Sequence, residues 1–169
     1  MSNPHFPLRL NLGFLITAAI GTSRDFTFDD EKMRLGEDLT VRDFVGTARF
    51  GRTPQGFLLQ GKFTGTVDLE CVRCLESFPQ TLTWSFTDLY AFDIRSISES
   101  NLLVPEDGQI DLAPLLREYA LLEIPIQPLC SPDCRGLCPE CGENRNRVDC
   151  GHGLPRSNPS FAALKDLLK

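Results

Sequence analysis

The cysteines constrain this chain most, because all seven of them fall in two parts of the sequence. The first part is Cys71-Val-Arg-Cys74, and the second begins after a gap of 55 residues and closes with a histidine. The candidate metal ligands are Cys71, Cys74, Cys130, Cys134, Cys138, Cys141, Cys150 and His152. Eight such ligands suffice for two tetrahedral zinc sites. The chain near residue 71 must therefore return to the segment that begins at residue 130.

The eight ligands form four sequence pairs, which combine into two sites in three ways. We favour a second site of Cys138, Cys141, Cys150 and His152, because these span only 15 residues and close their own loop at low entropic cost. The first site then unites the Cys71/Cys74 pair with the Cys130/Cys134 pair. The main alternative joins Cys71/Cys74 to Cys138/Cys141 and leaves Cys130/Cys134 with Cys150/His152.

Other interpretations of the cysteines are a single zinc ion, disulfides, buried free thiols, or a redox pair at Cys71 and Cys74. A reducing compartment disfavours disulfides. A redox Cys-x2-Cys motif lies at the start of a helix that follows a strand, and no second group of metal ligands accompanies it, so a redox role for Cys71 and Cys74 is disfavoured. Closed, cysteine-rich zinc sites are structural, whereas catalytic zinc keeps an open position. We therefore expect two structural zinc ions.

The middle of the chain alternates apolar and polar residues with a period of two, which predicts half-buried strands. The alternation runs without a break from Phe57 to Cys71, and small Gly61 and Gly65 within it predict a bend or a bulge. Residues 8–19 fit either a short helix or a further strand. The predicted strands cover about 24–34, 40–50, 56–70 and 79–92. Such strands form a twisted antiparallel sheet or an incomplete barrel.

A helix follows the predicted strands. Asp111 is a candidate cap with Pro114 in the first turn, and the helix must end before Ile124-Pro125. A short final helix is predicted after Asn158. The expected fold is α+β, with a mainly β domain over residues 1–129 that includes one helix near 111–123. A zinc-binding region over residues 130–169 is expected to pack on it through Cys71 and Cys74.

Charge is distributed unevenly along the chain. Residues 1–129 carry 11 basic and 18 acidic side chains, while residues 130–169 carry 6 and 5. A protein that binds nucleic acid mainly through phosphates is basic over its contact face. Any nucleic-acid contact must therefore be local or made through a partner protein. The candidate side chains for a local contact are Arg135, Arg145, Arg147 and Arg156.

Several classes of protein are disfavoured by motifs that the sequence lacks. No run of about 18 apolar residues exists, so we expect no membrane span. The first residues have no basic segment before an apolar one, so we expect no signal peptide and a cytoplasmic location. The sequence has no HExxH zinc motif, phosphate-binding glycine loop or nucleophile elbow. We therefore expect that the protein is not an enzyme.

The order and context of the cysteines resemble a known family. The first motif is Leu69-Glu-Cys71-Val-Arg-Cys74-Leu-Glu76, followed by Ile110-Asp-Leu112 and then by Leu122-Glu-Ile-Pro-Ile-Gln-Pro-Leu-Cys130. The last motif is Cys134-Arg-Gly-Leu-Cys138-Pro-Glu-Cys141-Gly-Glu-Asn144. Together these strings are similar to the YceD-like family of large ribosomal RNA subunit accumulation proteins, found in bacteria and plant plastids. The resemblance covers roughly residues 40–168.

The resemblance implies a role in accumulation or processing of large-subunit (23S) ribosomal RNA, and so in ribosome biogenesis. The implied partner is ribosomal RNA or a large-subunit assembly intermediate, reached directly or through a ribosomal protein. The sequence departs from the family pattern at Cys150-Gly-His152, where Cys-x-Cys is common. It also has Asn158-Pro159-Ser160 where Asp-Pro-Arg is frequent. Histidine is a competent replacement ligand for the first departure. The oligomeric state is not indicated.

Overall fold

The computed structural model of the chain describes residues 8–97 and 100–152. Contacts divide the chain into two compact units. The first unit comprises Met1–Asp68 and Pro79–Ile126, and the second comprises Leu69–Phe78 and Gln127–Lys169. The second unit therefore draws on two parts of the sequence that lie far apart, and these parts carry all the candidate ligands.

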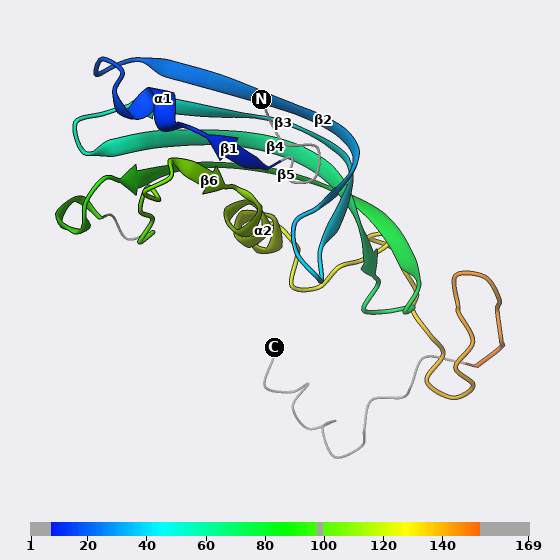
Figure 1. Cartoon of the computed structure of the whole chain (residues 1–169). Coiled ribbons are helices and arrows are strands. Elements are labelled where there is room, and N and C mark those ends of the chain that lie inside the picture. The colour runs from blue at the N-terminus through cyan, green and yellow to red at the C-terminus, as the bar shows by residue number, and fades with distance from the viewer. Residues whose placement is uncertain (1–7, 98–99, 153–169) are drawn as a thin grey trace. The chain divides into compact units, whose positions relative to one another are not determined.

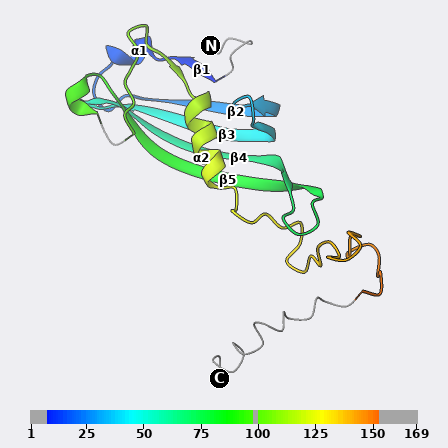
Figure 2. The ribbon, with the colours of Figure 1, turned by 90° about the horizontal axis from the view of Figure 1, so that it is seen from below.

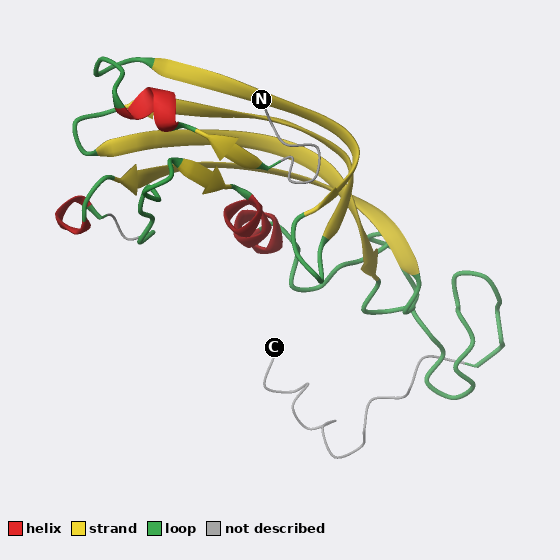
Figure 3. Ribbon diagram, viewed as in Figure 1, coloured by secondary structure: helices red, strands yellow, loops and turns green. Residues whose placement is uncertain are grey.

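The first unit is built on a sheet of four strands that follow one another in the order β2-β3-β4-β5 (Figures 1 and 3). The strands are β2 Ser23–Arg34, β3 Thr40–Arg52, β4 Gly56–Glu70 and β5 Ser77–Ala91. These bounds confirm the four strands predicted from the period-two pattern. The sheet is open and not a closed barrel, because β2 and β5 are its two edges.

Two glycines of β4 make room for neighbouring side chains. A Cβ atom on Gly61 would collide with the ring of Phe86, and one on Gly65 would collide with Val41. The irregularity lies on β3, between Arg42 and Val45, where the pairing with β4 shifts register. The predicted bulge is therefore present in the hairpin, but on the strand opposite Gly65.

One face of the sheet is covered by helix α2, Ala113–Leu122, which lies across it in Figure 2. Leu115, Leu116 and Ala120 of the helix are buried. The ring of Tyr119 stacks on Phe86 with the ring centroids 4.4 Å apart. Its hydroxyl donates a hydrogen bond to Asp88 at 2.9 Å. These contacts fix the helix against the apolar face that the alternation predicted.

The ends of α2 agree with the predicted helix except at the cap. Leu112, not Asp111, occupies the N-cap position. The Asp111 carboxylate instead accepts a hydrogen bond from the N–H of Ala113 at 2.9 Å, so it satisfies the first turn from one residue further back. Pro114 lies in the first turn, and the helix ends at Leu122, before the proline at 125.

Short elements complete the first unit. Strand β1, Arg9–Asn11, pairs antiparallel with β6, Gln109–Asp111. Helix α1, Gly13–Ile16, follows β1, so residues 8–19 form both a strand and a helix. A 3-10 turn, η1, covers Ile94–Ser96. The final helix predicted after Asn158 lies outside the described residues. No described helix is both long and apolar enough to cross a membrane.

Candidate metal centre

The second unit contains the same tight turn twice, and we call this turn a knuckle. In the first knuckle, Cys71–Glu76, the N–H of Leu75 donates to the carbonyl of Cys71 at 2.8 Å. The N–H of Cys71 donates in turn to the carbonyl of Glu76 at 3.0 Å. These two bonds hold both cysteines of the turn on one side of the backbone.

The second knuckle, Cys138–Glu143, repeats both bonds. The N–H of Gly142 donates to the carbonyl of Cys138, and the N–H of Cys138 donates to the carbonyl of Glu143, each at 2.8 Å. The residue after the second cysteine has a positive φ in both turns, +58° at Leu75 and +76° at Gly142. The two Cys-x2-Cys motifs therefore present their sulfurs in the same way.

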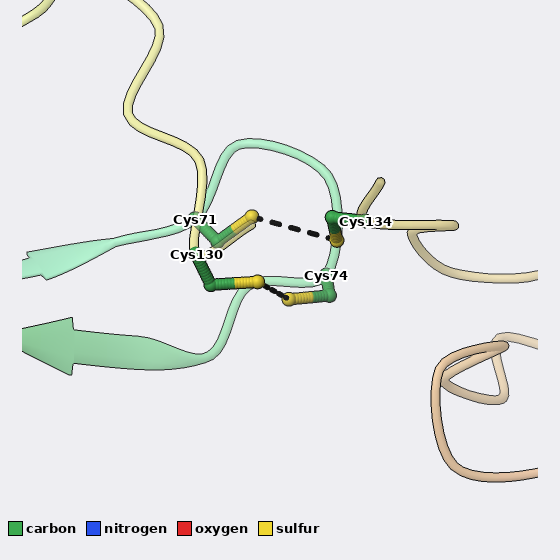
Figure 4. A group of neighbouring side chains, drawn as sticks. All are labelled: Cys71, Cys74, Cys130 and Cys134. Atoms are coloured by element: carbon green, nitrogen blue, oxygen red, sulfur yellow. Dashed lines mark hydrogen bonds between the residues drawn. The ribbon is translucent and has the colours of Figure 1, made fainter. Parts of the chain in front are cut away.

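The first knuckle lies against the Cys130/Cys134 segment and forms a group of four thiols with it (Figure 4). The Sγ atoms of Cys71 and Cys134 are 3.8 Å apart, and those of Cys74 and Cys130 are 3.6 Å apart. Four sulfurs at about 2.3 Å from a zinc ion are about 3.8 Å from one another in a tetrahedron. Disulfide sulfurs lie at about 2.05 Å. The spacing therefore fits a metal ion and excludes disulfides within this group.

The second knuckle forms the other group with Cys150 and His152. All four ligand atoms lie within 4.8 Å of one another, and Cys138 Sγ is 3.7 Å from His152 Nδ1. The other ring nitrogen of His152, Nε2, is 3.7 Å from a carboxylate oxygen of Glu140. A carboxylate beside the second ring nitrogen is typical of metal-binding histidines, because it orients the ring. Sequence reasoning gave Glu140 no role.

The structure therefore groups the eight side chains in the first of the two arrangements predicted from the sequence. In each group, all four ligand atoms lie within 4.8 Å of one another. The alternative of Cys71/Cys74 with Cys138/Cys141 is not the grouping that the structure has. Both groups lie wholly inside the second unit. That they bind metal stays a prediction.

Arg73 ties the first knuckle to the segment around Cys134. Its guanidinium donates to the carbonyl of Cys134 at 2.9 Å, and its own carbonyl accepts from the N–H of Leu137 at 2.9 Å. On the other side, the N–H of Val72 donates to the carbonyl of Pro128 at 3.0 Å. These bonds bring two segments that are distant in sequence into register, which is what the first group needs.

The first cysteine of each knuckle has a lowered thiol pKa, which favours binding of a cation at neutral pH. The backbone N–H of Cys130 is the largest influence on Cys71 and lowers the pKa of its thiol to about 6. The backbone N–H groups of Cys141 and Glu140 lower the pKa of Cys138 to about 6. Burial raises the pKa of Cys130 to about 12. The thiolate is the form that binds metal, so each knuckle begins with a preformed ligand.

Asn146 contacts the first group although it belongs to the loop that closes the second. Its Nδ2 donates to Cys134 Sγ at 3.2 Å, and its Oδ1 accepts from the N–H of Arg135 at 2.7 Å. Burial raises the pKa of Cys134, but hydrogen bonds, first among them the one from Asn146, leave it lowered. Sequence reasoning missed Asn146, because an asparagine between cysteines is not a ligand type and no spacing marks it.

Two of the four arginines proposed for local nucleic-acid contact are free to make one. The side chains of Arg135 and Arg145 have no hydrogen bond or ion pair with any residue that the structure describes. Arg147 is instead paired with Glu76 at 2.8 Å. Arg156 lies outside the described residues.

The first unit has pockets of its own. One cavity of about 250 Å³ is lined by Tyr90, Asp111 and Glu118 among other residues. Asp111 accepts the N–H of Ala113, and burial raises the pKa of the Tyr90 hydroxyl. No described residue of this pocket is a histidine, cysteine or serine. The two groups of four ligands are therefore the part of the described molecule whose chemistry is most distinctive.

Comparisons with known proteins agree with this choice of region. A family model described as large ribosomal RNA subunit accumulation protein YceD matches residues 59–168. A protein of Mycobacterium leprae is 33% identical over 143 residues, which cover 80% of this chain and 65% of that protein. The chloroplastic YCED homolog 1 of Zea mays is 35% identical over 142 residues, covering 66% of this chain and 48% of the homolog.

A third relative is the large ribosomal RNA subunit accumulation protein YceD of Haemophilus influenzae, 33% identical over 109 residues. That match covers 59% of this chain and 62% of the relative. The chain thus spans less than two thirds of the length of these relatives. No solved structure matches the chain significantly.

Proposed function

The chain belongs to the YceD family of large ribosomal RNA subunit accumulation proteins, and we propose that it is a non-enzymatic factor in ribosome biogenesis. In this role it supports the accumulation, processing or stability of 23S ribosomal RNA in the cytoplasm. The observation that carries the proposal is the family match over residues 59–168, which includes most of β4 and all of β5, α2 and both knuckles. The part of the chain with the most distinctive chemistry is thus the part that the family shares.

We propose further that each group of four ligands holds one structural zinc ion. The sulfur separations of 3.6 and 3.8 Å in the first group support this, because they are the edge lengths of a zinc–sulfur tetrahedron. When bound, zinc supplies cross-links between segments and no reaction. Each group already offers four protein ligands, which leaves no open position for a substrate. This supports a role without catalysis.

The partner is a large-subunit assembly intermediate, contacted through its RNA. Arg135 and Arg145 support a local RNA contact, since their guanidinium groups have no partner among the described residues. Guanidinium groups form charge-assisted hydrogen bonds with phosphates.

A second candidate function is that of a zinc-stabilised adapter that binds a ribosomal protein and never touches RNA. The observation that favours it is the excess of acidic over basic side chains in residues 1–129, 18 against 11, because such a surface attracts basic partners. Crosslinking to RNA in cells distinguishes the two: the adapter predicts none, and it also predicts capture of a ribosomal protein that survives nuclease treatment.

Depletion of the protein in growing cells tests the proposed function. We expect mature 23S ribosomal RNA to fall relative to 16S, and the 50S peak in a sucrose gradient to shrink. A complementing copy with Arg135→Ala and Arg145→Ala should restore the ratio only partly if RNA is contacted directly. Unchanged 23S to 16S ratios and an unchanged 50S peak after depletion contradict the proposal.

A further inference from the structure

We infer that Asn146 couples the two metal groups, so that filling the second group strengthens binding of metal in the first. The inference rests on the proposal that both groups hold zinc. The observation behind it is that Asn146 belongs to the loop of the second group and donates a hydrogen bond to Cys134, a ligand of the first group.

The position of Asn146 in the chain links it to the second group. It lies between Cys141 and Cys150, and both of these belong to that group. A metal ion held there closes this loop at both ends. Without the ion, the Cys150 end of the loop loses its attachment to the knuckle, and ordering Asn146 costs more conformational entropy.

The contacts of Asn146 link it to the first group. Its Nδ2 donates to the sulfur of Cys134 at 3.2 Å, and Oδ1 accepts from the N–H of Arg135 at 2.7 Å. Asn144 Oδ1 accepts from both the N–H and the Nδ2 of Asn146, each at 2.9 Å. The side-chain amide of Asn146 is thus held through its oxygen and its nitrogen, and the nitrogen donates to Cys134 Sγ.

The backbone of the same loop also lies on the strand-like segment after Cys134. The N–H of Arg145 donates to the carbonyl of Gly136 at 3.0 Å, and Leu137 and Asn144 form an antiparallel bridge. Arg147 adds an ion pair with Glu76 of the first knuckle, 2.8 Å long. The loop of the second group therefore reaches both halves of the first group, and Asn146 is its contact with a ligand atom.

A donor to a metal-bound thiolate stabilises the negative sulfur and fixes its direction. Loss of such an outer partner typically costs about 10- to 100-fold in metal affinity. Coupling between two binding sites is reciprocal, so filling the first group must strengthen the second by the same factor. Asn146 is a positioning residue in this scheme and not a ligand.

The test measures zinc affinity of the first group in the full chain by competition with a chromophoric chelator. Asn146→Asp keeps the acceptor for Arg135 but replaces the nitrogen that donates to Cys134 Sγ and to Asn144 Oδ1 with a carboxylate oxygen, while Asn146→Ala removes the acceptor and the donor together. Val148→Ala is the matched control, because Val148 lies in the same loop and is 50% exposed. We expect each Asn146 variant to weaken the first group about 10- to 100-fold and the control to leave it unchanged.

A double-mutant cycle separates coupling from simple loss of structure. Cys141→Ser with Cys150→Ser empties the second group and leaves Cys138 in place. We expect this change to weaken the first group as well, and Asn146→Ala to add little in that background. The ¹¹³Cd resonance of the four-cysteine group should shift in both Asn146 variants and not in Val148→Ala, which reports the hydrogen bond itself.

The outcomes distinguish this inference from the proposal on which it depends. Full additivity of Asn146→Ala with the emptied second group overturns the coupling, as does an unchanged first-group affinity in the Asn146 variants. A wild-type chain that takes up no metal in either group overturns the zinc proposal and the coupling together.

Discussion

Leu75 and Gly142 occupy equivalent positions in the two knuckles, one after the second cysteine in each. Both have a positive φ, +58° and +76°. Glycine adopts this conformation without strain, whereas a residue with a Cβ pays about 1–2 kcal/mol for it. Leu75 is also 57% exposed, so packing recovers little of that cost. The same turn is thus strained in one knuckle and relaxed in the other.

Replacing Gly142 by alanine and replacing Leu75 by glycine should therefore change the free energy of unfolding in opposite directions. Gly142→Ala has open space around the new Cβ, so only the backbone conformation opposes it. We expect it to lower the free energy of unfolding by about 1 kcal/mol. Leu75→Gly should raise it slightly or leave it unchanged. Guanidinium denaturation at a fixed free zinc concentration measures both. A loss for Leu75→Gly as large as that for Gly142→Ala contradicts the strain at Leu75.

At the scale of elements, the sequence predicted the strands that are long enough to show a period of two. Phe57 to Cys71 alternates without interruption, and β4 follows it from Gly56 to Glu70. Strand β1 has three residues, too few for a period to show, and it depends on β6, about 100 residues later. Contacts of this kind come from tertiary structure alone. Residues 8–19 could for that reason not be assigned.

The grouping of the metal ligands was also predictable from the sequence, but for a different reason. Short loops close at low entropic cost, and this argument selected the grouping that the structure has. The partners around the ligands could not be selected in this way. Asn146, Glu140 and Arg73 act through hydrogen bonds or ion pairs from loops, and no periodic or spacing signal marks them.

Helix α2 is connected to the loop between β2 and β3 by a two-bond ion pair. Arg117 donates from Nε and Nη2 to the two carboxylate oxygens of Asp38, at 2.8 and 2.5 Å. The hydrogen bonds from Arg117 are the main cause that lowers the pKa of Asp38 from 3.8 to about 2. A carboxylate with a lowered pKa stabilises the fold above its unfolded pKa. This contribution is lost as pH falls through the folded value.

Arg117→Ala should therefore destabilise the protein at neutral pH, and the difference from wild type should fade as pH falls from about 4 to about 2. Urea denaturation over that range measures the difference. Arg49→Ala is the control, because it removes an ion pair to Asp25 on the sheet, 3.6 Å long. An Arg117→Ala effect that is the same at both ends of the range contradicts the assigned role of Asp38.

On the scale of the whole molecule, the chain divides its tasks between two units. The first has an apolar core between the sheet and α2, while the second has few buried apolar residues and is organised around Cys71, Cys74 and Cys134. A unit with so small a core needs cross-links to stay folded. The predicted boundary after residue 129 stays a prediction, but contacts place Leu69–Phe78 with the C-terminal unit.

The central claim is that two closed groups of four ligands each hold one structural zinc ion. Zinc per chain in the purified full-length protein, by atomic emission, tests it most directly. Wild type should contain two zinc ions, and the variants Cys71→Ser/Cys74→Ser and Cys138→Ser/Cys141→Ser should each contain one. Fewer than two ions in the wild type, or two ions retained in either variant, would contradict the claim.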